Sequence, residues 1–293
     1  TAAAVSTDTS YNGLNPADVS VTNNDNDTAG ITVTPTSGLV TTEAGGTATF
    51  TVVLTAQPTA DVTIGLSSDD TSEGTVAPAS LTKIATAILA AESGNLDQWV
   101  TVDVDSRRMD GSSVMGLLPG DCFRMRDLLY GLMLPSGNDA ALAIGRQLAG
   151  SDAAFVGRMN ELVARLRLTD THFANPHGLD APGHVASAHD LALLGQALIR
   201  DFPDDYKIYS MREFVWNGIR QQNRNGLLAR DPSVDGIKTG HTDDGGYGVA
   251  ASCVDGTQRY VLVVNGLNSM QARADEARKL MNWAKENFVR RAI

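Results

Sequence analysis

The composition of this chain changes abruptly near residue 76, and that change limits the folds it can adopt. Residues 1–76 are about one quarter threonine and hold nine Asp or Glu side chains, but no Lys or Arg. Residues 77–293 hold the other 25 acidic residues and all 23 basic ones. β-Branched residues favour strands, whereas the later region shows the apolar spacing of helices. We therefore predict a β segment followed by a separately built region of mixed helices and strands.

The threonine-rich region reads as short strands joined by polar loops. Three segments alternate apolar and polar residues as strands do: ITVTPTSG (31–38), TATFTVVLT (47–55) and DVTIGLS (61–67). In this texture, and in the phrase VTTEAGG, the region resembles Calx-β-like or cadherin-like repeats of bacterial surface proteins. We predict an extended or poorly ordered tail over 1–30 and a threonine-rich β segment over 31–76.

Acidic clusters such as NNDND (23–27) bind calcium in repeats of that type. Here a solvated loop is the favoured interpretation, because one incomplete unit cannot complete an oxygen cage.

Composition also excludes several classes of function. The net charge is −11 and no basic stripe occurs, which argues against nucleic-acid binding. The longest apolar runs are too short to span a bilayer, and the first residues lack the pattern of a signal peptide. We expect no cofactor. Four histidines cluster in one loop without the spacing of metal ligands, so we expect no metal site. Cys122 and Cys253 are predicted to be buried thiols.

From Ala77 onward the pattern is that of helices followed by strands. Apolar spacing predicts helices over 81–92, on both sides of Pro135, over 151–168 and over 187–202. Three strands follow, with an Asp-Gly hairpin signal between the last two: VDGIKTG (234–240), YGVAASCV (247–254) and RYVLVVNGL (259–267). A final amphipathic helix has this apolar face: Met270, Ala274, Ala277, Met281, Ala284 and Phe288. The predicted class is α/β of the α+β type, an antiparallel sheet flanked by helices with a helical subdomain.

The segment PASLTKIATA places Lys83 three residues after Ser80, at a helix start. Ser80 could simply cap the helix, but a capping box uses Glu or Gln three residues later, and Lys83 supplies the opposite charge. Burial lowers the pKa of a lysine and makes it usable as a base. One helical turn would bring Lys83 beside Ser80 Oγ. The pair is therefore a candidate nucleophile and base.

Two later motifs strengthen that interpretation. PSGNDAA places Ser136 and Asn138 after an apolar helix, and VDGIKTGHT places Lys238, Thr239 and Gly240 at a strand end. Ser-x-x-Lys, Ser-Asp-Asn and Lys-Thr-Gly form the signature of penicillin-binding proteins and class A β-lactamases. With phrases such as THFANPHGLDAPGH, residues 77–290 resemble the low-molecular-weight penicillin-binding proteins, the serine D-alanyl-D-alanine carboxypeptidases. The resemblance implies a penicillin-binding-protein/β-lactamase-like catalytic domain over 77–293.

The resemblance also implies a mechanism and a set of roles. Ser80 would attack the penultimate D-alanine of a peptidoglycan stem peptide, Lys83 would take its proton, and water would hydrolyse the acyl-enzyme. β-Lactams would acylate the same serine. The remaining implied roles are these: proton relay by Ser136, orientation of Lys83 by Asn138, positive potential from Lys238, a hydroxyl from Thr239, substrate pairing along the strand through Gly240, an oxyanion N–H from His241, and carboxylate recognition by Arg273.

Several alternatives stay open. Endopeptidase activity on cross-links would use the same residues. A β-lactamase is disfavoured because no acidic residue lies in a context like its deacylating loop, and because the middle motif is Ser-Gly-Asn. The chain could also be an inactive cell-surface repeat protein, although the intact motifs favour an enzyme. An active enzyme would work outside the cytoplasmic membrane, in the periplasm or at the cell surface.

The chain departs from the resemblance just before Ser80. Relatives place a helix and a β-hairpin of the central sheet there, whereas this chain has the threonine-rich segment. Missing strands would leave an unpaired sheet edge. We therefore hypothesise that Thr47–Thr55 and Asp61–Ser67 form an antiparallel hairpin that takes the missing place.

Overall fold

The computed structural model describes residues 5–10, 12–15, 17, 28–37, 50–56, 74–109 and 111–288. The chain divides into two compact units, one of Thr1–Thr63 with Arg290–Ile293 and one of Ile64–Val289. Every predicted site residue belongs to the larger unit, which begins before the predicted boundary at Ala77. Within the described residues, no helix combines the length and apolar character that a membrane-spanning helix needs.

The smaller unit contains one pair of strands in its described part. Strand β1 (Ile31–Thr34) pairs antiparallel with β2 (Thr51–Leu54), and Thr51 Oγ1 donates to Thr34 O at 3.1 Å. The side chains of both strands are exposed or half-buried. The alternation of Thr and Val therefore predicted these two strands correctly.

The predicted partner of β2 was wrong. The hypothesis placed Thr47–Thr55 in the sheet that carries Lys238, but β2 forms a two-stranded sheet with β1. Pairing with β1 gives β2 a ladder on one side, formed from residues near it in the sequence. The other half of the predicted hairpin, Asp61–Ser67, lies outside the described residues.

The larger unit is built on a three-stranded antiparallel sheet in the order β11-β10-β9. Its strands are β9 (Val234–Thr242), β10 (Gly246–Asp255) and β11 (Gln258–Leu267), as the sequence predicted. The register places Lys238 opposite Ala250 and Thr239 opposite Val249. The three motif residues of β9 therefore lie on an outer strand of the sheet, in a fixed register with its centre.

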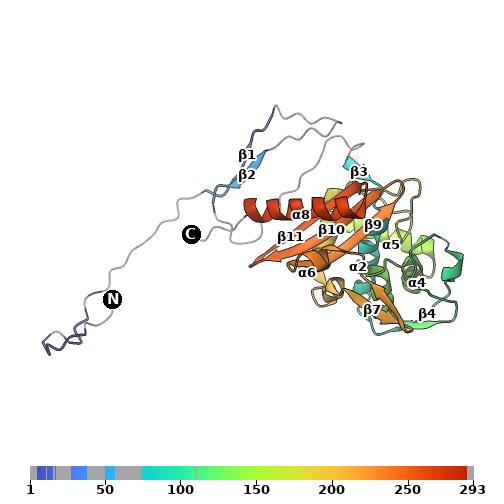
Figure 1. The fold of residues 1–293 in the computed structure, drawn as a ribbon, viewed down its shortest axis with the longest axis horizontal. Coiled ribbons are helices and arrows are strands. Elements are labelled where there is room, and N and C mark those ends of the chain that lie inside the picture. Colours follow the sequence, from blue (N-terminus) through green and yellow to red (C-terminus); the bar gives the residue numbers. More distant parts are fainter. Residues whose placement is uncertain are drawn as a thin grey trace. The chain divides into compact units, whose positions relative to one another are not determined.

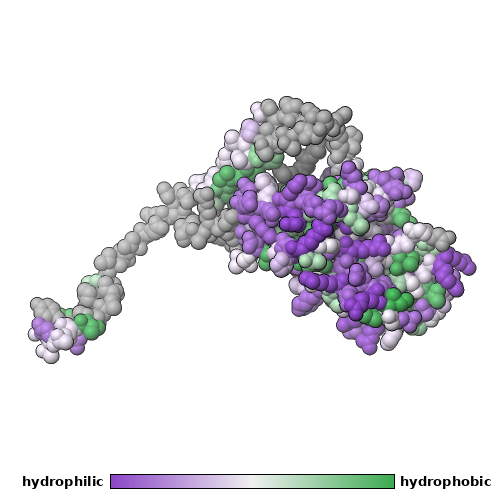
Figure 2. Space-filling model, viewed as in Figure 1, coloured by the Kyte–Doolittle hydropathy of each residue, from purple (hydrophilic) through white to green (hydrophobic). Residues whose placement is uncertain are grey.

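Helices cover both faces of this sheet (Figure 1). Helix α8 (Met270–Asn287) packs on β10 and β11, and it buries Ala274, Ala277 and Met281. Met270 and Phe288, the predicted ends of its apolar stripe, are exposed instead, at the first residue of the helix and at its C-cap. Its outer surface is hydrophilic (Figure 2).

The opposite face carries helix α6 (Ala188–Asp201), which contacts β10 and β11, and helix α2 (Lys83–Glu92), which contacts β9. Helix α2 is buried along nearly its whole length and packs on α3, α4, α5 and α6. The main apolar core surrounds it. A helix at the centre of the core gives its first residue, Lys83, a rigid support.

The remaining elements form the helical part and its edges. The helices are α3 (Met125–Met133), α4 (Asn138–Ala149), α5 (Asp152–Arg165) and α7 (Leu227–Arg230), with short helices η1 (Ala79–Thr82), η2 (Ser106–Arg108) and η3 (Asp205–Ser210). Three short antiparallel pairs are β3 (Thr75–Val76) with β6 (Ala186–Ser187), β4 (Trp99–Thr101) with β5 (Cys122–Arg124), and β7 (Glu213–Trp216) with β8 (Ile219–Gln222). The predicted break between two helices at Pro135 is confirmed.

One prediction about the cysteines was wrong. Cys253 is buried as expected, but Cys122 is exposed. Strand β5 alternates, so that Phe123 points into the core and its two neighbours point outward. The apolar neighbour of Cys122 in the sequence, Phe123, is the residue that faces inward. Both cysteines are free thiols.

Candidate active site

Ser80 lies in η1, directly before helix α2, on a turn held between two glycine segments. Ala79 has a φ of 49°, which is uncommon for a residue with a Cβ. A Cβ added to Gly178 would lie 1.7 Å from Ala79 O, and one added to Gly240 would lie 3.2 Å from Ala79 Cβ. These close approaches fix the turn that presents Ser80. Neither helix start uses Ser80 as its cap, so the simple capping interpretation is not observed.

Lys83 is fully buried, and its amine is surrounded by hydrogen-bonding oxygens. Its Nζ lies 2.7 Å from Ser80 Oγ, 2.6 Å from Asn138 Oδ1 and 2.6 Å from the backbone oxygen of His177. Burial lowers the pKa of Lys83 well below its usual value, and the Arg224 guanidinium lowers it further, whereas Asp139 raises it. A lysine with a depressed pKa, in contact with a serine hydroxyl, can act as a base toward it.

Ser136 and Asn138 lie at the start of helix α4. Ser136 has a φ of 70°, and its Oγ is buried with no hydrogen-bond partner in the described part of the chain. Its hydroxyl is therefore available to a ligand. Asn138 Nδ2 donates to Ser112 Oγ at 2.5 Å, which leaves Asn138 Oδ1 for Lys83.

Lys238 and its neighbours on β9 form the other wall. Lys238 is buried and donates to Thr239 O at 2.8 Å. Burial lowers the pKa of Lys238 well below its usual value. The positive charges of Lys83, Arg224 and Arg273 lower it further, by smaller amounts. Thr239 is buried as well. The structure thus places a second amine close enough to Lys83 for the charge of Lys83 to lower the pKa of Lys238.

His241 and Arg273 extend this wall. The exposed His241 ring lies against the Tyr247 ring, with 3.9 Å between centroids. Arg273, at the start of α8, is buried and donates to Gly240 O at 3.4 Å. Its guanidinium lies over the Tyr247 ring, and burial lowers its pKa. Arg273 is therefore held beside the Lys-Thr-Gly strand, where the resemblance placed it.

Arg224 is a site residue that the sequence reasoning missed. Its Nη1 donates to Ser113 Oγ at 2.7 Å, and burial lowers its pKa. Among the described residues, none of Lys83, Lys238, Arg224 and Arg273 forms an ion pair with a carboxylate. Arginines without carboxylate partners, here Arg224 and Arg273, create a positive potential that attracts an anion. Ser113 lies 111 residues away in the sequence, so no local pattern shows that Arg224 turns toward it.

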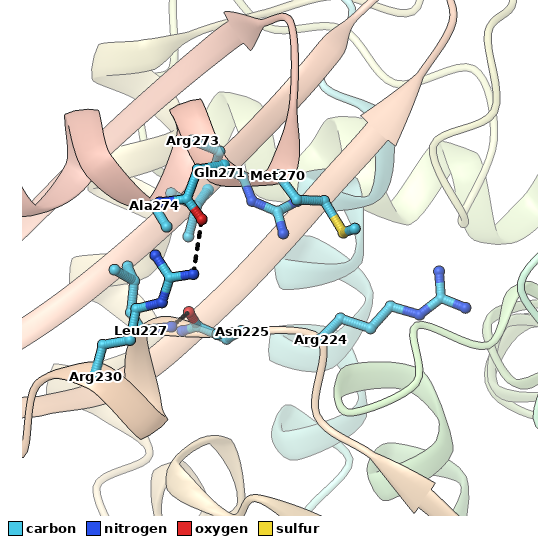
Figure 3. Close-up of a pocket in the computed structure, with 10 residues that line it drawn as sticks. Arg224, Asn225, Leu227, Arg230, Met270, Gln271, Arg273 and Ala274 are labelled. Carbon is cyan, nitrogen blue, oxygen red and sulfur yellow. Dashed lines mark hydrogen bonds between the residues drawn. The ribbon is translucent and has the colours of Figure 1, made fainter.

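A cavity of about 340 Å³ lies beside this group (Figure 3). It is bounded by the segment that carries Arg224, by the first turn of α8 and by Val249, the partner of Thr239. Figure 3 shows the Arg224 guanidinium directed away from the other lining side chains. Arg230 forms an ion pair with Asp275 at 3.7 Å, whereas no carboxylate among the described residues pairs with Arg273, another lining arginine.

The histidine-rich loop supports Lys83 through its backbone. His177 supplies the carbonyl oxygen, a role that no side-chain pattern reveals. His184 accepts from Ala174 N at Nδ1 and lies 2.8 Å from Thr82 Oγ1 at Nε2. Burial lowers the pKa of His177 to about 3 and that of His184 to about 4, so both are neutral near pH 7. In the described part of the chain, no three His, Cys, Asp or Glu side chains are arranged to hold a metal ion.

The fold and the Ser-Lys pair define the class of serine acyl-transfer enzymes to which penicillin-binding proteins belong. A sequence model described as D-alanyl-D-alanine carboxypeptidase matches residues 41–269, which is most of the chain. The chain therefore belongs to the peptidase S11 family of D-alanyl-D-alanine carboxypeptidases. The match begins inside the threonine-rich segment, earlier than the boundary at Ala77.

Individual relatives agree with this assignment. The chain is 47% identical over 223 residues to D-alanyl-D-alanine carboxypeptidase DacD of Escherichia coli, which covers 72% of the chain and 58% of that relative. It is 33% identical over 223 residues to DacF of Bacillus subtilis, covering 73% of the chain and 57% of that relative. The chain thus spans a little over half the length of these relatives.

Solved structures show the same fold. Penicillin-binding protein 6B of Escherichia coli superimposes with a TM-score of 0.68 at 45% identity, covering 72% of this chain and 70% of that one. The Streptomyces K15 DD-transpeptidase superimposes with a TM-score of 0.67 at 27% identity, covering 71% and 87%. The predicted penicillin-binding-protein fold is confirmed. The likeness of residues 1–76 to surface-protein repeats stays a prediction.

Proposed function

We propose that this chain is a serine D-alanyl-D-alanine carboxypeptidase that removes the terminal D-alanine from peptidoglycan stem peptides. Ser80 Oγ attacks the carbonyl carbon of the penultimate D-alanine and forms an ester, while the bond to the terminal D-alanine breaks. Water then hydrolyses the ester and regenerates the serine. The names of the relatives, which state this activity, support the proposal.

The observation that carries the proposal is the environment of Lys83. A serine hydroxyl is a weak nucleophile unless an adjacent base removes its proton. Lys83 Nζ lies 2.7 Å from Ser80 Oγ, and burial depresses its pKa, so that it can be neutral and accept this proton. No other buried lysine among the described residues contacts a serine hydroxyl.

The remaining residues fit the later steps. Ser136 Oγ, which has no hydrogen-bond partner in the described part of the chain, can pass a proton to the amine of the departing D-alanine. That amine belongs to a free amino acid whose carboxylate needs a positive site. Arg273 supplies that charge, because a guanidinium stays protonated, while Lys238 supplies an amine donor and Thr239 a hydroxyl. The backbone N–H groups of Ser80 and His241 would bind the oxyanion.

The same site would bind β-lactams as covalent inhibitors, because the lactam carbonyl would acylate Ser80. Rapid release of the lactam needs a base that activates water. The carboxylate that influences Lys83, Asp139, accepts backbone N–H bonds with both its oxygens, so it is not free to serve as that base. A carboxypeptidase therefore fits better than a β-lactamase. We place the enzyme outside the cytoplasmic membrane, where its substrate is found.

Covalent labelling with a fluorescent penicillin tests the proposal. The unmodified protein should acquire label in a 1:1 ratio, and Ser80→Ala should acquire none, because the ester cannot form. Ser93→Ala, at the far end of helix α2, is a matched control that should label normally. Release of D-alanine from a peptide ending in D-Ala-D-Ala should follow the same pattern. Absence of label on the folded, unmodified protein would contradict the proposed function.

The test can also separate the endopeptidase alternative. A cross-linked stem-peptide dimer should be cleaved much more slowly than a linear peptide that ends in D-Ala-D-Ala. Faster cleavage of the dimer would replace the carboxypeptidase assignment with an endopeptidase one on the same site.

A further inference from the structure

The buried carboxylate of Asp139 follows the Ser-Gly-Asn motif and has no role in the chemistry described above. Its side chain is fully buried at the start of helix α4. An acidic residue in a first helical turn commonly serves the helix dipole alone. Asp139 does more, because its carboxylate binds a separate segment of the chain.

That segment is the loop 112–117. Asp139 accepts hydrogen bonds from Met115 N at 2.8 Å, Gly116 N at 2.9 Å and Leu117 N at 3.0 Å, and also from Ala140 N at 2.9 Å. Three successive backbone N–H groups thus converge on one carboxylate. Charge-assisted bonds of this kind are among the stronger hydrogen bonds in proteins. The loop is consequently fixed relative to helix α4.

The fixed loop holds the neighbouring asparagine at two points. Ser112 Oγ accepts from Asn138 Nδ2 at 2.5 Å, and Ser113 O accepts from Asn138 N at 2.7 Å. The first bond decides which way the amide faces, because the nitrogen is directed to Ser112 and the oxygen is left for Lys83. A reversed amide would present a donor to the Lys83 amine. The loop also holds Arg224, which donates to Ser113 Oγ.

The crowding around Gly137 supports the same picture. A Cβ added there would lie 2.8 Å from Asp139 Oδ1 and 3.1 Å from Met115 N. The bond between Asp139 and the loop therefore occupies the space of a side chain at residue 137. This explains why the motif reads Ser-Gly-Asn in this chain.

We propose that Asp139 is a positioning residue, which holds the loop 112–117 so that Ser112 orients the Asn138 amide toward Lys83. This inference rests on the proposed function, since it assigns a role within the acylation of Ser80. Asp139 touches neither the substrate nor the reacting atoms. It acts through the loop, through Asn138 and through its charge.

The substitution Asp139→Asn tests the proposal, because it keeps the shape but places an amide N–H₂ against backbone donors and removes the charge. We expect penicillin labelling to slow roughly 10²-fold, the scale of a small misplacement of catalytic groups. The matched control is Asp190→Asn. Asp190 is also buried near a helix start and accepts from Asp170 N and Thr171 Oγ1, but it does not contact this loop. This control should lower thermal stability and leave the labelling rate of the folded protein unchanged.

Two further readouts separate positioning from a structural role. Removing the negative charge lowers the pKa of Lys83, so the acidic limb of the labelling rate should move to lower pH. The other titratable or charged groups that face Lys83 stay unchanged in this comparison: Arg224, Lys238, His177 and His184. In a double-mutant cycle, adding Ser112→Ala to Asp139→Asn should slow labelling little further, because both act on the same amide.

The outcomes distinguish this inference from the proposed function. Direct titration of Lys83 by NMR needs no activity, and a lower pKa in Asp139→Asn would support the inference even if no penicillin binds. Absence of label on the unmodified protein would remove the proposed function alone. Unchanged labelling, unchanged Lys83 titration and a stability loss equal to that of Asp190→Asn would overturn the positioning role. If Asp139→Asn and Ser112→Ala slow labelling by fully additive free energies, Asp139 does not act through Ser112.

Discussion

Strands β2 and β10 are both built from small, β-branched and apolar residues, but they are stabilised in different ways. Strand β2 has one partner, and its side chains are exposed or half-buried. Strand β10 has a partner on each side, and most of its residues are buried between helices. Two strands alone are marginal in water, whereas a sheet with covered faces is stable. The comparison shows that a strand pattern predicts local conformation but not how strongly the strand is held.

The largest loss of folding stability is expected when a charge is introduced into the three-stranded sheet, whose faces are covered by helices. Ala251→Asp on β10 would place a carboxylate among Val249, Cys253 and Ala277, in a cluster of buried apolar side chains. An unpaired buried charge destabilises a protein by about 3–5 kcal/mol. We expect a loss of soluble, cooperatively melting protein in thermal unfolding followed by circular dichroism. A melting temperature within a few degrees of that of the unmodified protein would show that water reaches this face of the sheet.

Lowering the pH should reduce the folding stability of the larger unit by an intermediate amount and leave the smaller unit unaffected. His177 and His184 have pKa values lowered from 6.5 to about 3 and about 4, mainly by burial. Their unfolded forms bind protons more readily, so their contribution to stability is complete above pH 6.5 and is lost as pH falls toward 4 and 3. For His184 the loss is on the order of 3 kcal/mol.

Thermal unfolding between pH 7 and pH 4 measures this loss. His184→Gln keeps a neutral donor and acceptor, so it should flatten the pH dependence without removing both hydrogen bonds. Hydrogen exchange at each pH would show whether protection falls in β9–β11 while β1 and β2 are unaffected, since residues 1–63 contain no histidine. A melting temperature that stays constant down to pH 4 would contradict the burial of these two rings as neutral groups.

The smallest effect is expected from the same charge in the exposed pair. Val53 on β2 is 56% exposed, so Val53→Asp removes little buried area. Surface substitutions of this kind usually change the free energy of unfolding by no more than about 0.5 kcal/mol. Denaturant unfolding of the larger unit and penicillin labelling should both be unchanged. A substantial loss of either would reveal a contribution of β2 that its exposure does not suggest.

Most of the fold of the larger unit could be predicted from local patterns. The helix break at Pro135, the three strands of the sheet and the Asp-Gly hairpin each depend on residues that are near one another in the sequence. The placement of Thr47–Thr55 failed because strand pairing is a choice among distant partners, and the alternation of Thr and Val is the same for each of them. The prediction that Cys122 is buried failed for a related reason. In a short strand, a shift of one residue moves a side chain from the buried face to the exposed face.

The site was predicted in part. Ser80, Lys83 and Asn138 could be named from spacing and motif order, and the structure brings these three together. Their roles, and those assigned to the residues of β9, remain proposals. The contributions of Arg224, the His177 carbonyl and Asp139 were missed. Each depends on an orientation or a backbone atom, and residue type carries no information about either.

The sequence alone determined which groups this protein can use, because helix spacing, strand alternation and the three motifs are local properties of the chain. It also determined that Lys83 is a poor capping residue, since its charge opposes the helix dipole at that end. Only the tertiary structure decided that Lys83 is buried, that three oxygens surround it and that its pKa falls. Whether Lys83 is buried depends on which distant segments of the chain pack over it. The basicity of Lys83 beside Ser80 therefore depends on the His177 loop and the start of helix α4 as much as on the helix that carries Lys83.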